Sequence, residues 1–229
     1  MKIISWNIRQ GGGSRAEAIA QALIQHQADV IILSEYQNNP AGNLIRIRLM
    51  LDGFHFQSPS TADKDKNGVL IATRSVSSFQ PVLHADDGFE ECVLECHWNQ
   101  LILCGVYLPH KKKHSRFDFL LNAIKTNTAS MIIAGDYNTG FNRIDQAGDS
   151  FWYEDKLRLL QKLGMKDAYR MFHQDIKEYS WYSHQGNGFR YDHTWVSDDL
   201  SDRVIRCEYS HVEREQNLTD HSMMILELK

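Results

Sequence analysis

Apolar, β-branched runs alternate along the chain with segments whose apolar residues recur at helical spacing. The runs predict strands over residues 2–6, 30–33, 68–73, 92–98, 101–107, 131–134, 193–196 and 223–227. Alternation of this kind is typical of α/β folds and argues against a helical bundle or an all-β barrel. The pattern therefore predicts an α/β sandwich.

Helices are predicted in several of the gaps between these strands. The best marked begins at Ser14, whose hydroxyl can accept from a free backbone amide while Glu17 closes a capping box. A second begins near Ser115, and a third covers residues 152–163 and ends at Gly164. Between two of the strands, Asn99-Gln100 indicates a hairpin turn, so the sheet content is predicted to be mixed.

Bulk composition favours one domain over residues 1–229. A chain of 229 residues that is 42% hydrophobic can bury a single large core. It holds only 4 prolines, and no Ser/Gly-rich or charged tract marks a linker. The first residues run directly into strand-like sequence, without a leader or an apolar span of membrane length, so we expect a cytoplasmic protein.

The formal net charge of −4 does not by itself indicate a nucleic-acid-binding protein, which often carries a basic excess. A metal site built from carboxylates would contribute negative charge, and its metal would restore the attraction for phosphate. The 4 cysteines lack the paired C-x-x-C spacing of a zinc site and are expected to be buried thiols.

Polar residues with metal or phosphate chemistry stand where apolar strand-like runs end or begin. Taken alone, each is more often a turn former, a solvated strand end or a packed side chain. Together they indicate a site, because functional side chains collect at strand ends that the sheet holds in place. They are Asn7, Glu35, Tyr107, Asp136 with Asn138, Asp192, and Asp220 with His221.

Spacing adds detail to two of these positions. Asp136 and Asn138 are two residues apart, so on an extended backbone both side chains would point toward one bound group. In the pair Asp220-His221, a carboxylate that can ligate a metal precedes an imidazole that can work near neutral pH.

These residues lie in short motifs whose order resembles the endonuclease/exonuclease/phosphatase superfamily. The motifs are W-N-I at 6–8, S-E at 34–35, G-x-Y-x-P at 105–109, G-D-x-N at 135–138, R-x-D at 190–192 and T-D-H at 219–221. The resemblance implies a four-layer α/β sandwich, in which two mixed β-sheets pack face to face with helices outside. It also implies an active site at one edge of the sandwich.

The resemblance further implies roles for the metal site and the attacking water. Glu35 would be the principal ligand of Mg²⁺ or Mn²⁺, assisted by Asn7 and Asp220. Asp136 would orient or deprotonate the water, and Asn138 would hold water or a phosphate oxygen. A hard cation on oxygen ligands is what a repelling phosphodiester anion requires.

Three more catalytic roles follow from the same resemblance. Tyr107 would contact the phosphate, and His221, oriented by Asp192, would stabilise the charge that develops at phosphorus. Two positions depart from the family pattern: Ser34 stands where glutamine often precedes the glutamate, and His110 stands where DNA-acting members often have asparagine.

Within the superfamily, residues 151–170 and 179–192 are most similar to the exonuclease III and apurinic endonuclease branch. In that branch an aromatic side chain helps to form a pocket for a flipped-out abasic sugar, a role that would fall here to Trp181 with Phe189. The alternative is that Trp181 simply packs between the sheets. Arg190, in the same segment, is also predicted to bind substrate.

A basic run follows the G-x-Y-x-P motif at the mouth of the predicted site. Lys111, Lys112 and Lys113, with Arg116 close by, are predicted to contact backbone phosphate, which would make binding sensitive to salt. A solvated loop is the alternative for these residues.

We therefore predict a metal-dependent phosphodiesterase whose partner is nucleic acid, most plausibly DNA. The alternatives are an enzyme for a small or lipid-borne phosphate, a ribonuclease, and a non-catalytic binding module. No amphipathic stretch indicates a membrane. A module that had lost its chemistry would be expected to lack Glu35, Asp136 or His221, and all three are present.

Overall fold

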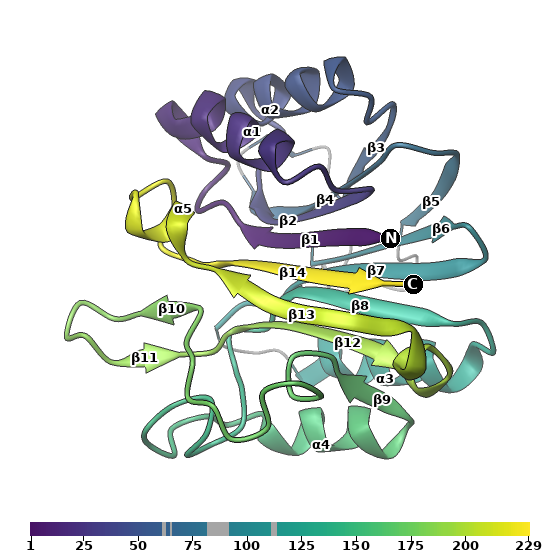
Figure 1. The fold of residues 1–229 in the computed structure, drawn as a ribbon, viewed down its shortest axis with the longest axis vertical. Helices are drawn as coiled ribbons and strands as arrows, with labels where there is room; N and C mark the ends of the chain where they lie inside the picture. The colour runs from purple at the N-terminus through teal and green to yellow at the C-terminus, as the bar shows by residue number, and fades with distance from the viewer. Residues whose placement is uncertain (61–62, 65, 82–91, 111–113) are drawn as a thin grey trace.

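The computed structural model describes residues 1–60, 63–64, 66–81, 92–110 and 114–229. Two six-stranded β-sheets pack face to face at its centre (Figure 1). The first contains, in spatial order, β13 (Val204–Ser210), β14 (Met223–Leu228), β1 (Lys2–Asn7), β2 (Val30–Tyr36), β4 (Gly68–Thr73) and β3 (Phe56–Pro59). The second contains β5 (Ser77–Pro81), β6 (Val93–Trp98), β7 (Leu101–Tyr107), β8 (Met131–Asp136), β12 (Asp192–Ser197) and β9 (Met165–Asp167).

Helices cover the outer face of each sheet. In Figure 1, α1 (Ala16–Gln25) and α2 (Pro40–Leu51) lie over the first sheet, while α3 (His114–Thr126) and α4 (Glu154–Lys162) lie over the second. The predicted four-layer α/β sandwich with mixed sheets is thus confirmed. A short hairpin of β10 (Trp181–Tyr182) and β11 (Gly188–Phe189), the helix α5 (Val212–Glu215), and 3-10 turns at Gly13–Arg15 and Asp198–Arg203 complete the described elements.

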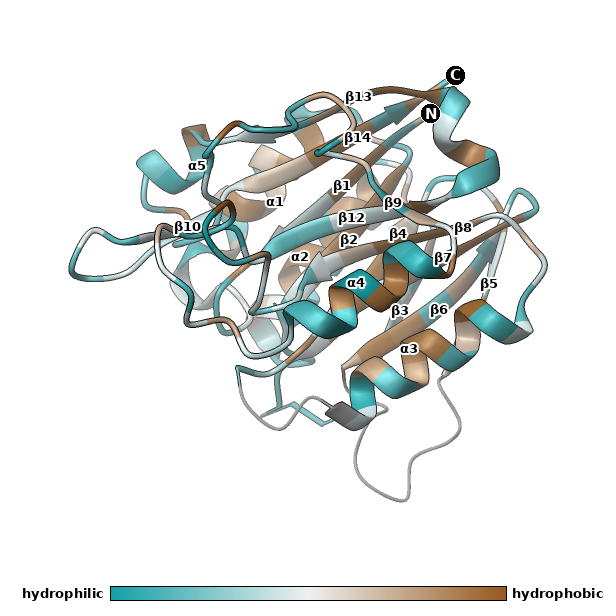
Figure 2. Ribbon diagram, turned by 90° about the horizontal axis from the view of Figure 1, so that it is seen from below, coloured by the Kyte–Doolittle hydropathy of each residue, from teal (hydrophilic) through white to brown (hydrophobic). Residues whose placement is uncertain are grey.

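Strands in the middle of the sandwich are buried on both faces, which explains their nearly continuous apolar sequence. In β1, Ile3 belongs to the core between the sheets, whereas Ile4 and Trp6 point to the core beneath α1 and α2. Figure 2 shows the same pattern, with hydrophobic residues concentrated on the strands and on the inner sides of α3 and α4. None of the helices in the described ranges is long and apolar enough to cross a membrane.

The predicted strands are present, with bounds that differ by a few residues at most. The hairpin turn is confirmed, because Trp98 pairs with Leu101 and the two residues between them have positive φ angles, 48° at Asn99 and 67° at Gln100. The helices α2 and α5 and the strands β3, β5, β9, β10, β11 and β13 were not predicted. Several of these are short or lie at sheet edges, where hydrophobic periodicity is weak.

The predicted capping box at Ser14 is wrong. Ser14 lies in a 3-10 turn, and α1 begins at Ala16 with no side-chain cap at Arg15. Glu17 instead accepts a hydrogen bond from Arg48 Nε of α2 at 2.9 Å. The glycines before Ser14 adopt left-handed conformations, so the chain enters the helix through a tight turn.

Candidate active site

The ends of four central strands meet at one edge of the sandwich. β1 and β2 run parallel with Asn7 opposite Ser34, and β7 and β8 run parallel with Tyr107 opposite Asp136. β12 begins at the same edge, where Asp192 is opposite Asp136. This register brings together polar residues from distant parts of the sequence, as the strand-end pattern predicted.

Asn7 links the two sheets at this edge. Its Nδ2 donates to Glu35 Oε1 at 3.1 Å and to Asp136 Oδ2 at 2.9 Å. Its Oδ1 accepts from the Arg9 amide at 2.9 Å, and Thr219 Oγ1 donates to its backbone carbonyl at 2.8 Å. A single buried amide therefore spans two carboxylates, one from each sheet.

Glu35 stands at an irregularity of β2, where the pairing with β4 shifts register between Ser34 and Tyr36. Its φ angle is 53°, a left-handed conformation that a residue other than glycine adopts only under strain. Its Oε2 accepts from the Gln10 amide at 2.8 Å and from Asn67 Nδ2 at 3.3 Å. These contacts fix the carboxylate in one orientation at the strand end.

Asp136 is 1% exposed and is held by Asn138. The Asn138 amide donates to its Oδ1 at 2.8 Å, and Asn138 Nδ2 donates to its Oδ2 at 3.1 Å. Asn138 lies beyond the end of β8 with a φ of 48°, so the two side chains meet through a left-handed turn and not through an extended strand. Burial raises the pKa of Asp136, although the neighbouring His221 opposes that shift.

His221 and Asp192 form a buried dyad. His221 Nδ1 lies 2.8 Å from Asp192 Oδ2, and the His221 carbonyl accepts from Trp6 Nε1 at 3.1 Å. Burial alone would lower the pKa of His221, but Asp192 and then Asp136 outweigh burial and raise it to about 10. A pKa raised in this way favours the cationic imidazole at neutral pH, in which both ring nitrogens can donate.

Asp136, Asp192 and His221 place one potential ligand atom each within 4.8 Å of one another, and this cluster could hold a metal ion. Among the described residues, neither Glu35, the predicted principal ligand, nor Asp220 belongs to such a cluster. Asp220 accepts from Trp181 Nε1 at 3.1 Å and lies 4.0 Å from Arg9 Nε. Because His221 is protonated here, a metal could bind its ring only by displacing a proton.

Tyr107 lies half-buried at the end of β7, close to both carboxylates. Burial, and then the charges of Glu35 and Asp136, raise the pKa of its phenol well above the usual value, while Asn67 opposes the shift through a hydrogen bond. The phenol therefore keeps its proton and can donate to a phosphate oxygen.

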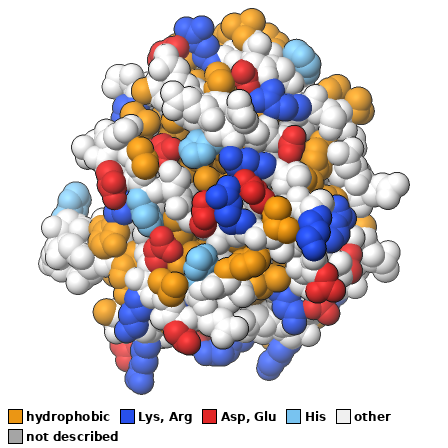
Figure 3. Space-filling model, viewed as in Figure 1, with side chains coloured by type: hydrophobic (Ala, Val, Ile, Leu, Met, Phe, Trp, Pro, Cys, Tyr) orange, Lys and Arg blue, Asp and Glu red, His pale blue; other side chains and the backbone are white. Residues whose placement is uncertain are grey.

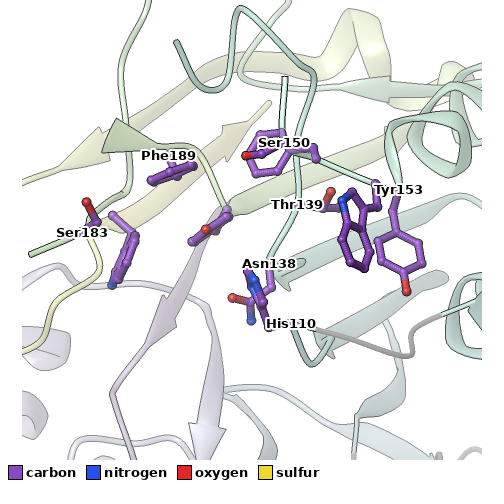
Figure 4. Close-up of a pocket in the computed structure, with 11 residues that line it drawn as sticks. His110, Asn138, Thr139, Ser150, Tyr153, Ser183 and Phe189 are labelled. Atoms are coloured by element: carbon purple, nitrogen blue, oxygen red, sulfur yellow. The ribbon is translucent and has the colours of Figure 1, made fainter. Parts of the chain in front are cut away.

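An aromatic pocket of about 420 Å³ adjoins this group of residues. Its lining residues are His110, Asn138, Thr139, Ser150, Phe151, Trp152, Tyr153, Trp181, Ser183, Phe189 and Tyr191. Figure 4 shows Phe189 and Ser183 on one side, Thr139 and Tyr153 on the other, and Asn138 and His110 between them. Ring centroids of Trp181 lie 5.8 Å from Phe189 and 5.4 Å from Tyr191, so the predicted pair Trp181 and Phe189 does line one cavity.

The prediction that Arg190 binds substrate is wrong. Its side chain is 0% exposed, and its guanidinium is enclosed by two buried carboxylates. Nε donates to Asp145 at 2.7 Å, and the terminal nitrogens donate to Asp145 and Asp167. The guanidinium carbon also lies 5.2 Å from the centroid of the Tyr169 ring. Arg190 is therefore part of the interior and has no surface to offer to a ligand.

The predicted basic run is placed only in part. Lys111, Lys112 and Lys113 lie outside the described residues. Arg116 lies half-buried on α3, where its Nε donates to Cys92 Sγ at 3.3 Å, and it is not among the residues that line the aromatic pocket. On the face shown in Figure 3, Lys and Arg side chains are interspersed with Asp and Glu.

Two side chains at the site were missed. Ser34 Oγ donates to the Val106 carbonyl at 2.9 Å and accepts from the Asp136 amide at 3.3 Å, so it joins β2 to the strands that carry Tyr107 and Asp136. The sequence did carry a signal for Ser34, because serine stands there in place of the glutamine that is frequent in the family. Asn67, which contacts Glu35, lies before β4 in a polar segment that gave no signal.

The chain belongs to the Endonuclease/Exonuclease/phosphatase family, whose sequence profile matches residues 4–221. Among individual proteins, it is similar to a DNA-(apurinic or apyrimidinic site) endonuclease of Dictyostelium discoideum, with 24% identity over 236 residues. The match covers 89% of this chain and 64% of that relative, so the chain spans less than two thirds of the relative's length.

Solved structures confirm the fold. An AP endonuclease from Archaeoglobus fulgidus matches with a TM-score of 0.86 and 18% identity, over 100% of this chain and 99% of that one. A 3′ phosphatase from Neisseria bound to a product DNA hairpin matches with a TM-score of 0.83 and 20% identity, over 100% and 99%. A 3′-5′ exonuclease from Neisseria meningitidis gives a TM-score of 0.83 and 21% identity over the full length of both chains.

Proposed function

We propose that this chain hydrolyses phosphodiester bonds of the DNA backbone with the help of a divalent metal ion. The observation that carries the proposal is the arrangement at the sandwich edge. Asn7 joins the carboxylates of Glu35 and Asp136, with His221, paired with Asp192, beside them. Carboxylates suited to a cation and a fixed cationic donor are what a phosphodiester anion needs from an active site.

The donors at this edge fit a hard cation such as Mg²⁺ or Mn²⁺. They are carboxylate and amide oxygens, the ligands that such a cation prefers, and burial raises the pKa of the Asp136 carboxylate among them. Glu35 and Asn7 would hold the ion, with Asp220 as a third candidate ligand. Asn7 would turn its Oδ1 toward Glu35 to do so, because its Nδ2 points there in this structure. When bound, such an ion offsets the phosphate charge and polarises the P–O bond.

The protein side chains would supply the rest of the reaction. Asp136 orients the attacking water and accepts its proton, as its raised pKa allows. The water oxygen forms the new bond to phosphorus, and the bond from phosphorus to the 3′-oxygen breaks in line with it. That oxygen leaves with the bonding electrons and takes a proton from solvent to become the 3′-hydroxyl. His221, with Nδ1 held by Asp192, directs its other ring nitrogen to the phosphoryl oxygen where charge develops. Asn138 and Tyr107 hold the remaining oxygens.

Two features favour DNA as the substrate, and one further prediction agrees with it. The relatives described above include an abasic-site endonuclease and a phosphatase bound to a DNA hairpin. The aromatic pocket beside Asn138 suits a sugar or base taken out of the stack, which makes abasic-site cleavage one form of the proposed activity. The run Lys111–Lys113 follows Tyr107 in sequence and remains a predicted phosphate contact.

The test is a gel assay of the purified protein on one labelled oligonucleotide. The forms compared are intact duplex, abasic-site duplex, single-stranded DNA and RNA, each with Mg²⁺, Mn²⁺ or EDTA. We expect cleavage of DNA with metal and none with EDTA. No cleavage of any form, by a folded protein that binds metal, would refute the proposal and point to a small or lipid-borne phosphate.

Two variants test the assigned roles. Glu35→Gln removes a ligand charge and His221→Ala removes a donor, and each is expected to lower kcat by roughly 100-fold or more. Glu35→Gln should leave the unfolding midpoint nearly unchanged. His221→Ala leaves the buried Asp192 carboxylate without its partner and should lower the midpoint, so its rate is measured at a temperature where the variant is folded. Glu208→Gln, on β13, is the matched control and should keep the wild-type rate. Wild-type rates in either active-site variant would overturn the assignment.

A further inference from the structure

Trp152 is the most exposed of the large hydrophobic side chains that the structure describes, at 76% of its surface. Burial of apolar surface is favourable, so an indole left in water at the rim of a pocket is a candidate binding surface. Trp152 lies in the loop before α4 and lines the same cavity as Asn138, whose side chain donates to Asp136. The exposed ring therefore belongs to a cavity whose lining includes Asn138, the residue that holds Asp136.

Apart from Tyr153, which stacks on Phe117, the other aromatic residues of the pocket contact one another. Phe151 lies 6.0 Å from Phe189 and 5.9 Å from Tyr191 between ring centroids, and Phe189 stacks on Tyr191 at 5.3 Å. Within the described ranges, Trp152 makes no ring-to-ring contact of this kind. Its face is thus free to stack on a ligand.

The cavity is large enough to hold a small ligand, and the exposed indole indicates which chemical group that ligand carries. About 420 Å³ falls within the range of roughly 300–1,000 Å³ typical of pockets that enclose whole small ligands. A bare deoxyribose has no aromatic face and can offer an exposed indole only its C–H groups. A nucleobase has such a face, and aromatic side chains stack on bases without regard to sequence.

We propose that Trp152 stacks on the base of an unpaired nucleotide, held in the aromatic pocket with its phosphate at the catalytic edge. The proposal rests on the proposed nuclease function and gives it a substrate class: DNA with a single-stranded or frayed end, with its bases present. A paired base cannot reach the indole without leaving its duplex, so fully paired DNA binds less well.

The test is a thermodynamic cycle between the indole and the base. Binding of a labelled single-stranded oligonucleotide is measured by anisotropy in EDTA, where no turnover occurs. A second set of oligonucleotides carries one tetrahydrofuran residue, which lacks a base, at each position in turn. Every oligonucleotide is measured with wild-type protein and with Trp152→Ala.

In the wild type, removing the base at one position should weaken binding by roughly 5- to 100-fold, the range expected for one base–aromatic stack. Trp152→Ala should cause a similar loss with the intact strand and little further loss when that base is absent. Trp152→Phe should retain part of the coupling, and Phe172→Ala, at another exposed aromatic residue, should show none.

Purely additive losses at every position, or an unchanged affinity in Trp152→Ala, would overturn the proposal. So would wild-type protein that does not bind single-stranded DNA. Failure of the nuclease function would look different, because the cycle would still report coupling while no nucleic acid is cleaved with metal. A wild-type protein that cleaves DNA but shows no coupling would refute the stacking proposal and leave the nuclease function standing.

Discussion

Replacement of Arg190 separates a structural role from a substrate-binding role. The guanidinium offsets the charges of Asp145 and Asp167, which are 0% and 5% exposed. Arg190→Leu would leave these carboxylates buried in the interior with much of their compensation removed. Breaking a buried ion pair by removing one partner costs about 3–5 kcal/mol. Because Arg170 also pairs with Asp145, we expect the lower part of that range.

For a domain of this size, 1 kcal/mol shifts Tm by about 2–4 °C, so the variant should melt roughly 6–15 °C below the wild type. Urea unfolding followed by circular dichroism, with activity assayed at a temperature where both proteins are folded, provides the test. We expect a lower unfolding midpoint and a KM within about twofold of wild type. An unchanged midpoint with a raised KM would refute the reasoning, since it would show that the guanidinium reaches the substrate. Arg143→Leu, a replacement outside the Arg190 cluster, serves as the control.

Three further predictions follow from the same structure. Burial would raise the pKa of Asp167, but Arg190 more than reverses this and holds that pKa well below its usual value. In acid the unfolded chain therefore binds a proton at Asp167 that the folded chain does not. Stability should therefore fall as pH drops below about 4, and Tm measured between pH 7 and pH 3 should fall less steeply in Asp167→Asn. Gly135→Ala should lower stability by at least about 2 kcal/mol in urea, because φ is +150° and a Cβ would lie 1.9 Å from the Val106 carbonyl oxygen. Ser34→Ala should cost about 1–3 kcal/mol and slow turnover, whereas a normal urea midpoint with a normal rate would show that its hydroxyl does not position Asp136.

The fold and the strand-end residues were predictable because both follow from local patterns. Continuous apolar runs identify strands buried on two faces, and a polar residue that ends such a run must emerge at an edge. Asn7, Asp136 and His221 were found in this way, and the structure brings them together. Short edge strands such as β9 and β11 carry too few residues for a periodic signal, so they were missed.

Side chains whose role is to hold other side chains in place could not be predicted, because that role depends on which segments of the chain meet in space. Arg190 in an R-x-D motif looks the same in sequence whether its guanidinium faces a phosphate or two buried carboxylates; only the positions of Asp145 and Asp167 decide. Ser34 is a parallel case. Its hydroxyl matters because β7 and β8 of the second sheet pass within hydrogen-bonding distance. Its partners, Val106 and Asp136, lie 72 and 102 positions further along the chain.

Contacts between distant segments also explain why the backbone of Glu35 can be strained. Glu35 keeps a left-handed backbone only because the Gln10 amide, Asn67 and Asn7 all bind its carboxylate oxygens. Strain of this kind persists when the surroundings over-determine a conformation, and it fixes a ligand before the substrate arrives. The left-handed turn from Arg9 to Gly13, which displaced the predicted helix start, also aims the Gln10 amide at Glu35. The error at Ser14 and the orientation of the Glu35 carboxylate therefore share one cause.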